Sequence, residues 1–157
     1  MPLTFPNVGI QSIEMRLTRA VAVAESPFTY EQQAYDFGGA RWEAEIVLPP
    51  LSYAEARSVE AFLIGLKGRS GTFTFGHPLH FINKSIITIG ATAVNNQTVN
   101  ASGNAVDAGN YFQLGNYLYI VTEDFSGTGE MSIQPPMREA ISTQTQLDFD
   151  KPVSTWR

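Results

Sequence analysis

The amino-acid sequence predicts a mainly β protein with one α-helix, in which a β-sandwich-like domain carries a small inserted β-barrel-like module. Apolar and polar residues alternate along several segments, which is the two-residue period of a half-buried strand. Only residues 52–66 have the spacing of an amphipathic helix. After residue 83, lysine and arginine become rare and short apolar runs are separated by turn residues, which is typical of small β modules.

The first ten residues, MPLTFPNVGI, predict an extended arm, because Pro2 and Pro6 disfavour a helix. The apolar side chains of this arm need a cover, which is supplied either by the same domain or by a neighbouring subunit. On the second alternative, the arm is a candidate subunit interface formed by Leu3, Phe5 and Val8.

Strand patterns follow the arm. Residues 11–17 alternate between apolar and polar side chains, and residues 20–24 continue the strand. Gly38-Gly39 predicts a turn. Residues 41–48 alternate again, and Pro49-Pro50 ends this strand because proline cannot donate to a β-ladder.

The predicted helix spans residues 52–66. Ser52 and Glu55 have the spacing of a capping box at its start. One face carries an apolar stripe, formed by Val59, Phe62, Leu63 and Leu66. We expect this stripe to pack on the apolar face of residues 42–48, which is the nearest candidate.

The rest of the chain divides into an insert and a tail. Gly115-Asn116 predicts a two-residue hairpin turn inside the insert. In the tail, residues 145–149 predict a further strand that returns to the first sheet. The predicted division is a sandwich-like domain of residues 1–82 and 137–157, with an inserted module of residues 83–136.

The composition excludes several classes of protein. The net charge is -5 and the sequence pI is about 4.9, so recognition of nucleic acid is not expected. The chain has no cysteine, and therefore no disulfide framework or thiolate metal site. No secretory signal pattern opens the sequence, and its apolar runs are far shorter than the roughly 20 residues of a membrane span, so no membrane insertion is expected.

Two histidines are the candidate metal ligands. His77 and His80 stand three residues apart, a spacing that suits a shared metal on a helix or tight turn. Pro78 disfavours a helix there, and no carboxylate lies within ten residues. These observations favour ordinary loop histidines, with no metal and no cofactor.

Two tyrosines are candidates for stacking on a glycan. Tyr117 and Tyr119 share one face of a predicted strand, so their rings are placed to form a platform for a sugar. The alternative is that they belong to the core of a small barrel. The chain has no nucleophile elbow and no glycine-rich phosphate loop, so no catalytic residue is identified and the protein is not expected to be an enzyme.

One segment resembles a known group of proteins. Residues 38–78, GGARWEAEIVLPPLSYAEARSVEAFLIGLKGRSGTFTFGHP, are similar to the N-terminal domain of small tail proteins of tailed bacteriophages. In those proteins a tryptophan-bearing strand runs into Leu-Pro-Pro-Leu, an Ala/Glu-rich helix and a phenylalanine-rich strand. The matching positions are Trp42, residues 48–51, residues 61–63, Leu66, Gly68 and Phe73.

The later part of the chain extends the resemblance. Residues 107–110 resemble the turn before a hairpin in the β insert of such proteins, and residues 135–138 resemble the closure of that insert. Two positions depart from the pattern: the turn ends in Asn110 rather than aspartate, and Trp156-Arg157 stand where an apolar residue is usual.

The resemblance implies a virion structural protein of the distal-tail, adaptor or hub type. Such a protein forms a homo-oligomeric ring, by analogy a hexamer, between the tail tube and the hub or fibre proteins. Its partners are copies of itself and other tail proteins, and it is assembled in the cytoplasm of the bacterial host. The alternative function is a carbohydrate-binding module that contacts host surface glycans.

Overall fold

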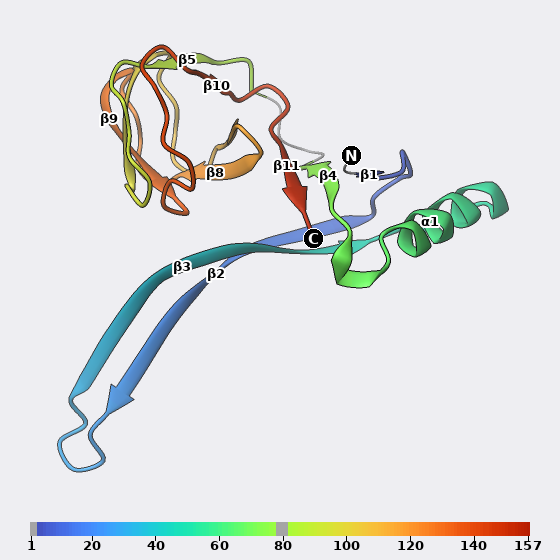
Figure 1. The fold of residues 1–157 in the computed structure, drawn as a ribbon, viewed down its shortest axis with the longest axis horizontal. Coiled ribbons are helices and arrows are strands. Elements are labelled where there is room, and N and C mark those ends of the chain that lie inside the picture. The colour runs from blue at the N-terminus through green and yellow to red at the C-terminus, as the bar shows by residue number, and fades with distance from the viewer. Residues whose placement is uncertain (1–2, 78–81) are drawn as a thin grey trace.

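The computed structural model describes residues 3–77 and 82–157 (Figure 1). The protein is mainly β, with 48% of its residues in strands and 11% helical, and this confirms the predicted fold class. Among the described residues the strands form a two-stranded hairpin, a three-stranded sheet and a closed six-stranded barrel. The barrel lies at one end, and the hairpin projects away from it as a long curved arm (Figure 1).

The element bounds are as follows. The strands are β1 (Leu3–Thr4), β2 (Ser12–Glu25), β3 (Gln32–Val47), β4 (Phe73–Gly76), β5 (Ser85–Thr88), β6 (Thr98–Gly103), β7 (Tyr111–Leu114), β8 (Tyr117–Val121), β9 (Thr128–Gln134), β10 (Gln146–Asp148) and β11 (Val153–Trp156). The helices are α1 (Tyr53–Gly65) and a single 3₁₀ turn, η1 (Gly68–Ser70).

Strands β2 and β3 form one antiparallel hairpin of 14 and 16 residues. Its turn lies at residues 26–31, where the Ser26 amide donates to the Glu31 carbonyl at 3.0 Å. The prediction of a turn at Gly38-Gly39 is wrong. The register shifts between Arg19 and Val21, so these glycines form an irregularity inside β3, where Gly38 has a φ of 72° that glycine tolerates.

The capping box of α1 is confirmed. The Glu55 carboxylate accepts from the Ser52 amide at 2.8 Å and from the Ser52 hydroxyl at 2.6 Å, and the Ser52 hydroxyl oxygen accepts from the Glu55 amide. The aromatic contacts of the helix are not made with residues 42–48, where the sequence led us to expect them. The Phe62 ring instead lies 5.5 Å from that of Phe5 and 5.4 Å from that of Phe73, while Leu63 is exposed.

The N-terminal arm docks on its own chain. Strand β1 pairs in parallel with β4, and β4 pairs on its other side with β11. Phe5 follows β1 and is half-buried in the aromatic cluster with Phe62, Phe73 and Phe75. Leu3 stays exposed and Val8 is half-buried, so the arm offers little apolar surface beyond Leu3. Its role in a subunit interface stays a prediction.

The barrel holds the main hydrophobic core. Its strand order is β10-β5-β6-β9-β8-β7, closed where β10 pairs with β7. The predicted hairpin turn at Gly115-Asn116 is confirmed, since Leu114 pairs with Tyr117 across it. The core consists of Ile86, Val99, Ala101, Val106, Phe112, Leu114, Tyr119, Val121, Phe125, Met131, Ile133, Met137, Leu147 and Phe149.

The strand expected to return to the first sheet belongs to the barrel instead. Strand β10 pairs with β5, and Leu147 and Phe149 are fully buried in the barrel core. The strand that returns to the first sheet is β11, which pairs with β4. The strands of the barrel therefore extend over residues 85–148, beyond the boundary at 136 that the sequence predicts.

Candidate interaction site

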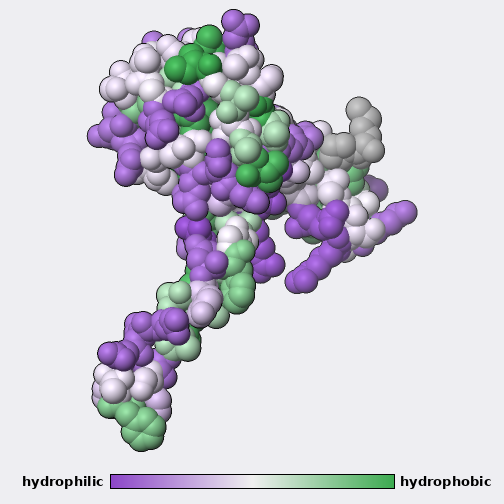
Figure 2. Space-filling model, turned by 60° about the vertical axis from the view of Figure 1, so that its left-hand side comes forward, coloured by the Kyte–Doolittle hydropathy of each residue, from purple (hydrophilic) through white to green (hydrophobic). Residues whose placement is uncertain are grey.

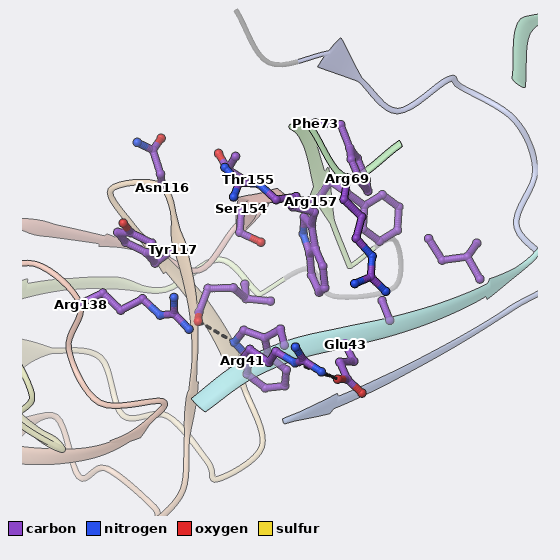
Figure 3. Close-up of a pocket in the computed structure, with 16 residues that line it drawn as sticks. Arg41, Glu43, Arg69, Phe73, Asn116, Tyr117, Arg138, Ser154, Thr155 and Arg157 are labelled. Atoms are coloured by element: carbon purple, nitrogen blue, oxygen red, sulfur yellow. Dashed lines mark hydrogen bonds and ion pairs between the residues drawn. The ribbon is translucent and has the colours of Figure 1, made fainter. Parts of the chain in front are cut away.

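A cleft of about 690 Å³ opens where the base of the hairpin, the barrel and the three-stranded sheet meet (Figure 3). Strand β3 lines one side and the turn and start of β8 line another. Strands β4 and β11 and the turn η1 contribute further lining residues. Four arginines line this cleft, which we call the arginine cleft: Arg41, Arg69, Arg138 and Arg157. Three large aromatic side chains beside them have indole or phenol groups: Trp42, Tyr117 and Trp156.

Side-chain hydrogen bonds hold the walls of the cleft together. The Trp42 indole N–H donates to the Leu118 carbonyl at 2.8 Å, which joins the hairpin base to the barrel. The Arg138 guanidinium donates to the Ala40 carbonyl at a second point of the same contact. On the opposite wall, the Trp156 indole N–H donates to the Phe75 carbonyl at 3.1 Å. Because both indole donors are satisfied, the rings are fixed in position.

Positive charge dominates the cleft, although the whole chain carries a net charge of -5. Among the described residues, the one acidic side chain that lines it is Glu43, which lies 2.7 Å from Arg41. The hydrogen bond from Arg41 is the main reason that the pKa of Glu43 lies below its usual value. Within the described residues, Arg69 and Arg157 make no ion pair. The cleft therefore presents guanidinium groups that suit carboxylates or other planar anions.

The two predicted glycan-stacking tyrosines have different positions. Tyr119 is only 1% exposed, and its ring stacks on Phe112 at 5.5 Å inside the barrel. Its hydroxyl oxygen accepts from the Arg138 amide, and burial raises the pKa of the phenol. Tyr119 therefore belongs to the core, as the alternative interpretation has it, and its ring is not accessible to a sugar. Tyr117 is half-buried and lines the cleft, with the Arg138 guanidinium 5.5 Å from its ring centre.

The candidate metal ligands do not form a site among the described residues. His77 is half-buried and stacks on Tyr111 at 5.7 Å, and its burial lowers the pKa of the imidazole. His80 lies outside the residues that the structure describes. Within residues 3–77 and 82–157, no three histidine, aspartate or glutamate side chains gather in a group able to hold a metal ion.

A second surface was not anticipated from the sequence. The outer part of the hairpin, residues 20–37, which we call the distal hairpin, is exposed on both faces. Figure 2 shows apolar side chains along this arm and at its end. Its large exposed hydrophobic residues are Val21, Val23, Phe28, Tyr30, Tyr35 and Phe37. The concentration of aromatic residues in the weakly patterned segment 27–37 is the signal that identifies this surface in retrospect.

The comparisons with known proteins leave the family of the chain open. No protein-family model and no curated protein matches the sequence. In the part of the chain that the structure describes, no helix has both the length and the apolar character needed to cross a membrane. A function must therefore be argued from the arginine cleft and the distal hairpin.

Proposed function

We propose that this chain is a structural protein of a bacteriophage tail, which forms a homo-oligomeric ring or adaptor between the tail tube and hub or fibre proteins. The observation that carries the proposal is the distal hairpin, whose apolar side chains are left exposed by residues 3–77 and 82–157 of their own chain. The similarity of residues 38–78 to small tail proteins supplies the biological setting, in which the ring is part of the virion.

The distal hairpin has the properties of an assembly element. A two-stranded hairpin without a packed face is at best marginally stable in water. Here Phe28 is 90% exposed and Tyr30 is 75% exposed, at the end of an arm that projects from the molecule (Figure 1). Contiguous exposed apolar surface of this kind marks an interaction site in soluble proteins. A neighbouring subunit would cover it.

The shape of the chain favours a ring over a symmetric dimer. The distal hairpin projects from the molecule (Figure 1). The arginine cleft is lined by residues 41–46 at the base of the same hairpin. A protruding element on one copy and a concave surface on the next form a heterologous contact, which closes into a ring when the rotation permits. The ring order expected from the resemblance is six.

The native mass of the purified chain, with negative-stain images, tests the proposal. A single closed oligomer supports it, and a monomer at every concentration up to high micromolar contradicts it. A shortened variant is the matched comparison, in which Asn-Gly replaces residues 20–39 between the paired residues Arg19 and Ala40. We expect this variant to keep a folded barrel and to be monomeric.

A second candidate function is binding of host surface glycans. The observation in its favour is Tyr117, whose half-buried ring lines the arginine cleft next to Arg138. An aromatic face beside a guanidinium suits an acidic sugar. A glycan array separates the candidates: binding that Tyr117→Ala removes supports the module, and silence of the wild-type chain on acidic and neutral polysaccharides contradicts it.

A further inference from the structure

We infer that the arginine cleft of one copy receives the hairpin tip of a second copy of this chain, where the hairpin tip is residues 25–31. The inference deepens the proposed function and depends on it, since it names the two surfaces that meet between subunits. Three features of the molecule carry it: the charges of the two surfaces, their aromatic side chains, and the length of the hairpin.

The charges of the two surfaces are complementary. Residues 20–40 contain no lysine or arginine, and their acidic residues are Glu25, Glu31 and Asp36. Asp36 already pairs with Arg19 at 2.9 Å, which leaves the two glutamates of the hairpin tip without a cation among the described residues. In the arginine cleft, Arg69 and Arg157 are likewise without an anion. Docking would pair the two glutamates with the two arginines. Charge-assisted hydrogen bonds between guanidinium and carboxylate groups are among the strong hydrogen bonds in proteins.

The aromatic side chains fit the same arrangement. Phe28 and Tyr30 lie between the two glutamates and are the most exposed aromatic residues at the end of the arm. The cleft offers Tyr117 and Trp156 together with its guanidinium groups. Aromatic rings pack against other rings at their edges and faces and against guanidinium planes, so this lining suits an acidic and aromatic segment.

The conformation and the size of the hairpin tip also agree with the cleft. The Tyr30 amide donates to the Ser26 carbonyl at 2.9 Å, and the Ser26 amide donates to the Glu31 carbonyl. These bonds fix the turn before any partner is present, which lowers the entropy lost on docking. The cleft volume of about 690 Å³ lies in the range of roughly 300–1,000 Å³ that is typical of sites for compact ligands. It suits a turn of a few residues rather than a whole domain.

The hairpin tip that fills the cleft has to come from a different copy. Arg41 lines the cleft and Gln32 adjoins the tip, both on strand β3. On the partner strand, Thr18 pairs with Arg41 and Glu25 with Gln32, so seven residues at about 3.3 Å each separate them by roughly 23 Å. The β2–β3 ladder holds the hairpin extended, with its tip at the far end of the projecting arm (Figure 1). The contact is therefore heterologous, and repetition of it generates a ring or a filament.

Charge reversal on each surface tests the inference. The tip-reversed variant is Glu25→Arg with Glu31→Arg, and the cleft-reversed variant is Arg69→Glu with Arg157→Glu. Arg41 and Arg138 are left intact because each contacts its own chain. Sedimentation velocity and native mass report assembly. We expect either variant alone to assemble with a dissociation constant raised by roughly tenfold or more, because like charges then face each other.

Mixing the two variants is the decisive step. In an equimolar mixture every arginine tip faces a glutamate cleft and every glutamate tip faces an arginine cleft, so we expect an alternating oligomer with an even number of subunits. The control is Arg57→Glu with Lys67→Glu, which makes the same charge change on exposed residues outside the cleft. It should assemble as the wild-type chain does.

The outcomes separate this inference from the proposed function. A wild-type ring that both reversed variants retain overturns the docking and leaves the ring. Reversed variants that dissociate without regaining assembly in the mixture also overturn it. A wild-type monomer contradicts both proposals. Unchanged assembly together with loss of acidic-glycan binding in the cleft-reversed variant would assign the cleft to a glycan instead.

Discussion

The barrel and the region that precedes it bury their apolar side chains to very different extents. Within the described residues, nearly all buried hydrophobic side chains lie in or beside the barrel, and only Phe62 and Phe75 precede residue 82. Most of the large exposed hydrophobic residues lie in the preceding region, on the hairpin and on α1. One region thus has a core of its own, and the other presents its apolar surface outward.

The topology explains this difference. The closed barrel pairs each of its strands on both sides, so it encloses its side chains and leaves no free edge. Among the described residues, the hairpin has only two strands and no second layer along its outer half. The side chains on both of its faces therefore stay exposed there, whichever face they alternate onto. The barrel therefore supplies most of the buried core of the free chain, and we propose that a neighbouring copy covers the hairpin.

The largest effect is expected from Phe112→Ala in the barrel. Phe112 is fully buried and stacks on Tyr119 and Phe149. Loss of the ring leaves a cavity, and we expect the free energy of unfolding to fall by about 3–5 kcal/mol. Phe28→Ala on the hairpin tip is the matched control, with an expected change within about 0.5 kcal/mol. Urea denaturation of both variants under monomeric conditions measures the contrast, and equal losses would contradict the division of roles.

A smaller loss is expected from Phe62→Ala. This ring anchors α1 to Phe5 and Phe73, in a cluster smaller than the barrel core and partly open to solvent. We expect a loss of about 2 kcal/mol, at the scale of burying one phenylalanine side chain. Denaturation followed by circular dichroism measures it. A loss as large as that of Phe112→Ala would show that the two regions share one core.

Loss of the helix cap is expected to lower the free energy of unfolding by less than Phe62→Ala does. Ser52→Ala removes the hydroxyl that accepts from the Glu55 amide at the first turn of α1. Such a change costs about 1 kcal/mol. Ser52→Thr retains the hydroxyl and should recover most of this stability in the same unfolding experiment. Equal free energies of unfolding for the wild-type chain, Ser52→Ala and Ser52→Thr would contradict this expectation. They would mean that α1 unfolds separately from the region whose unfolding the experiment detects.

The smallest effect concerns the dependence of the helix cap on pH. The hydrogen bond from the Ser52 hydroxyl, with a second from its amide, lowers the pKa of Glu55 below its usual value. A carboxyl whose pKa falls on folding stabilises the protein above its unfolded pKa and loses that contribution as the pH falls through the folded value. Glu55→Gln should therefore narrow the stability difference between pH 7 and pH 3. If the free energy of unfolding depended on pH in the same way in the wild-type chain and in Glu55→Gln, the carboxyl of Glu55 would make no pH-dependent contribution to stability.

Local features of the fold were predictable from the sequence. The capping box at Ser52 and the turn at Gly115-Asn116 depend on residues within a few positions of each other, and both are confirmed. The alternation of residues 41–48 likewise predicts a strand, because the side-chain period of a strand is local.

Features that depend on distant partners were not predictable. Residues 146–148 have the pattern of a strand, but the choice of the barrel over the first sheet depends on the fit of Leu147 among core residues. The two-residue period of a strand places Tyr117 and Tyr119 on the same face, yet only Tyr119 is enclosed by the barrel. The arginine cleft is assembled from residues as far apart as 41 and 157, so no local spacing identifies it.

Hydrogen exchange measured over a range of protein concentrations tests the central claim most directly. We expect amides of the barrel strands to be protected at every concentration. Amides of the distal hairpin, residues 20–37, should exchange rapidly in the dilute monomer and become protected as the chain assembles. Hairpin amides that exchange at the same rate in monomer and oligomer would contradict the claim that a neighbouring copy completes this arm.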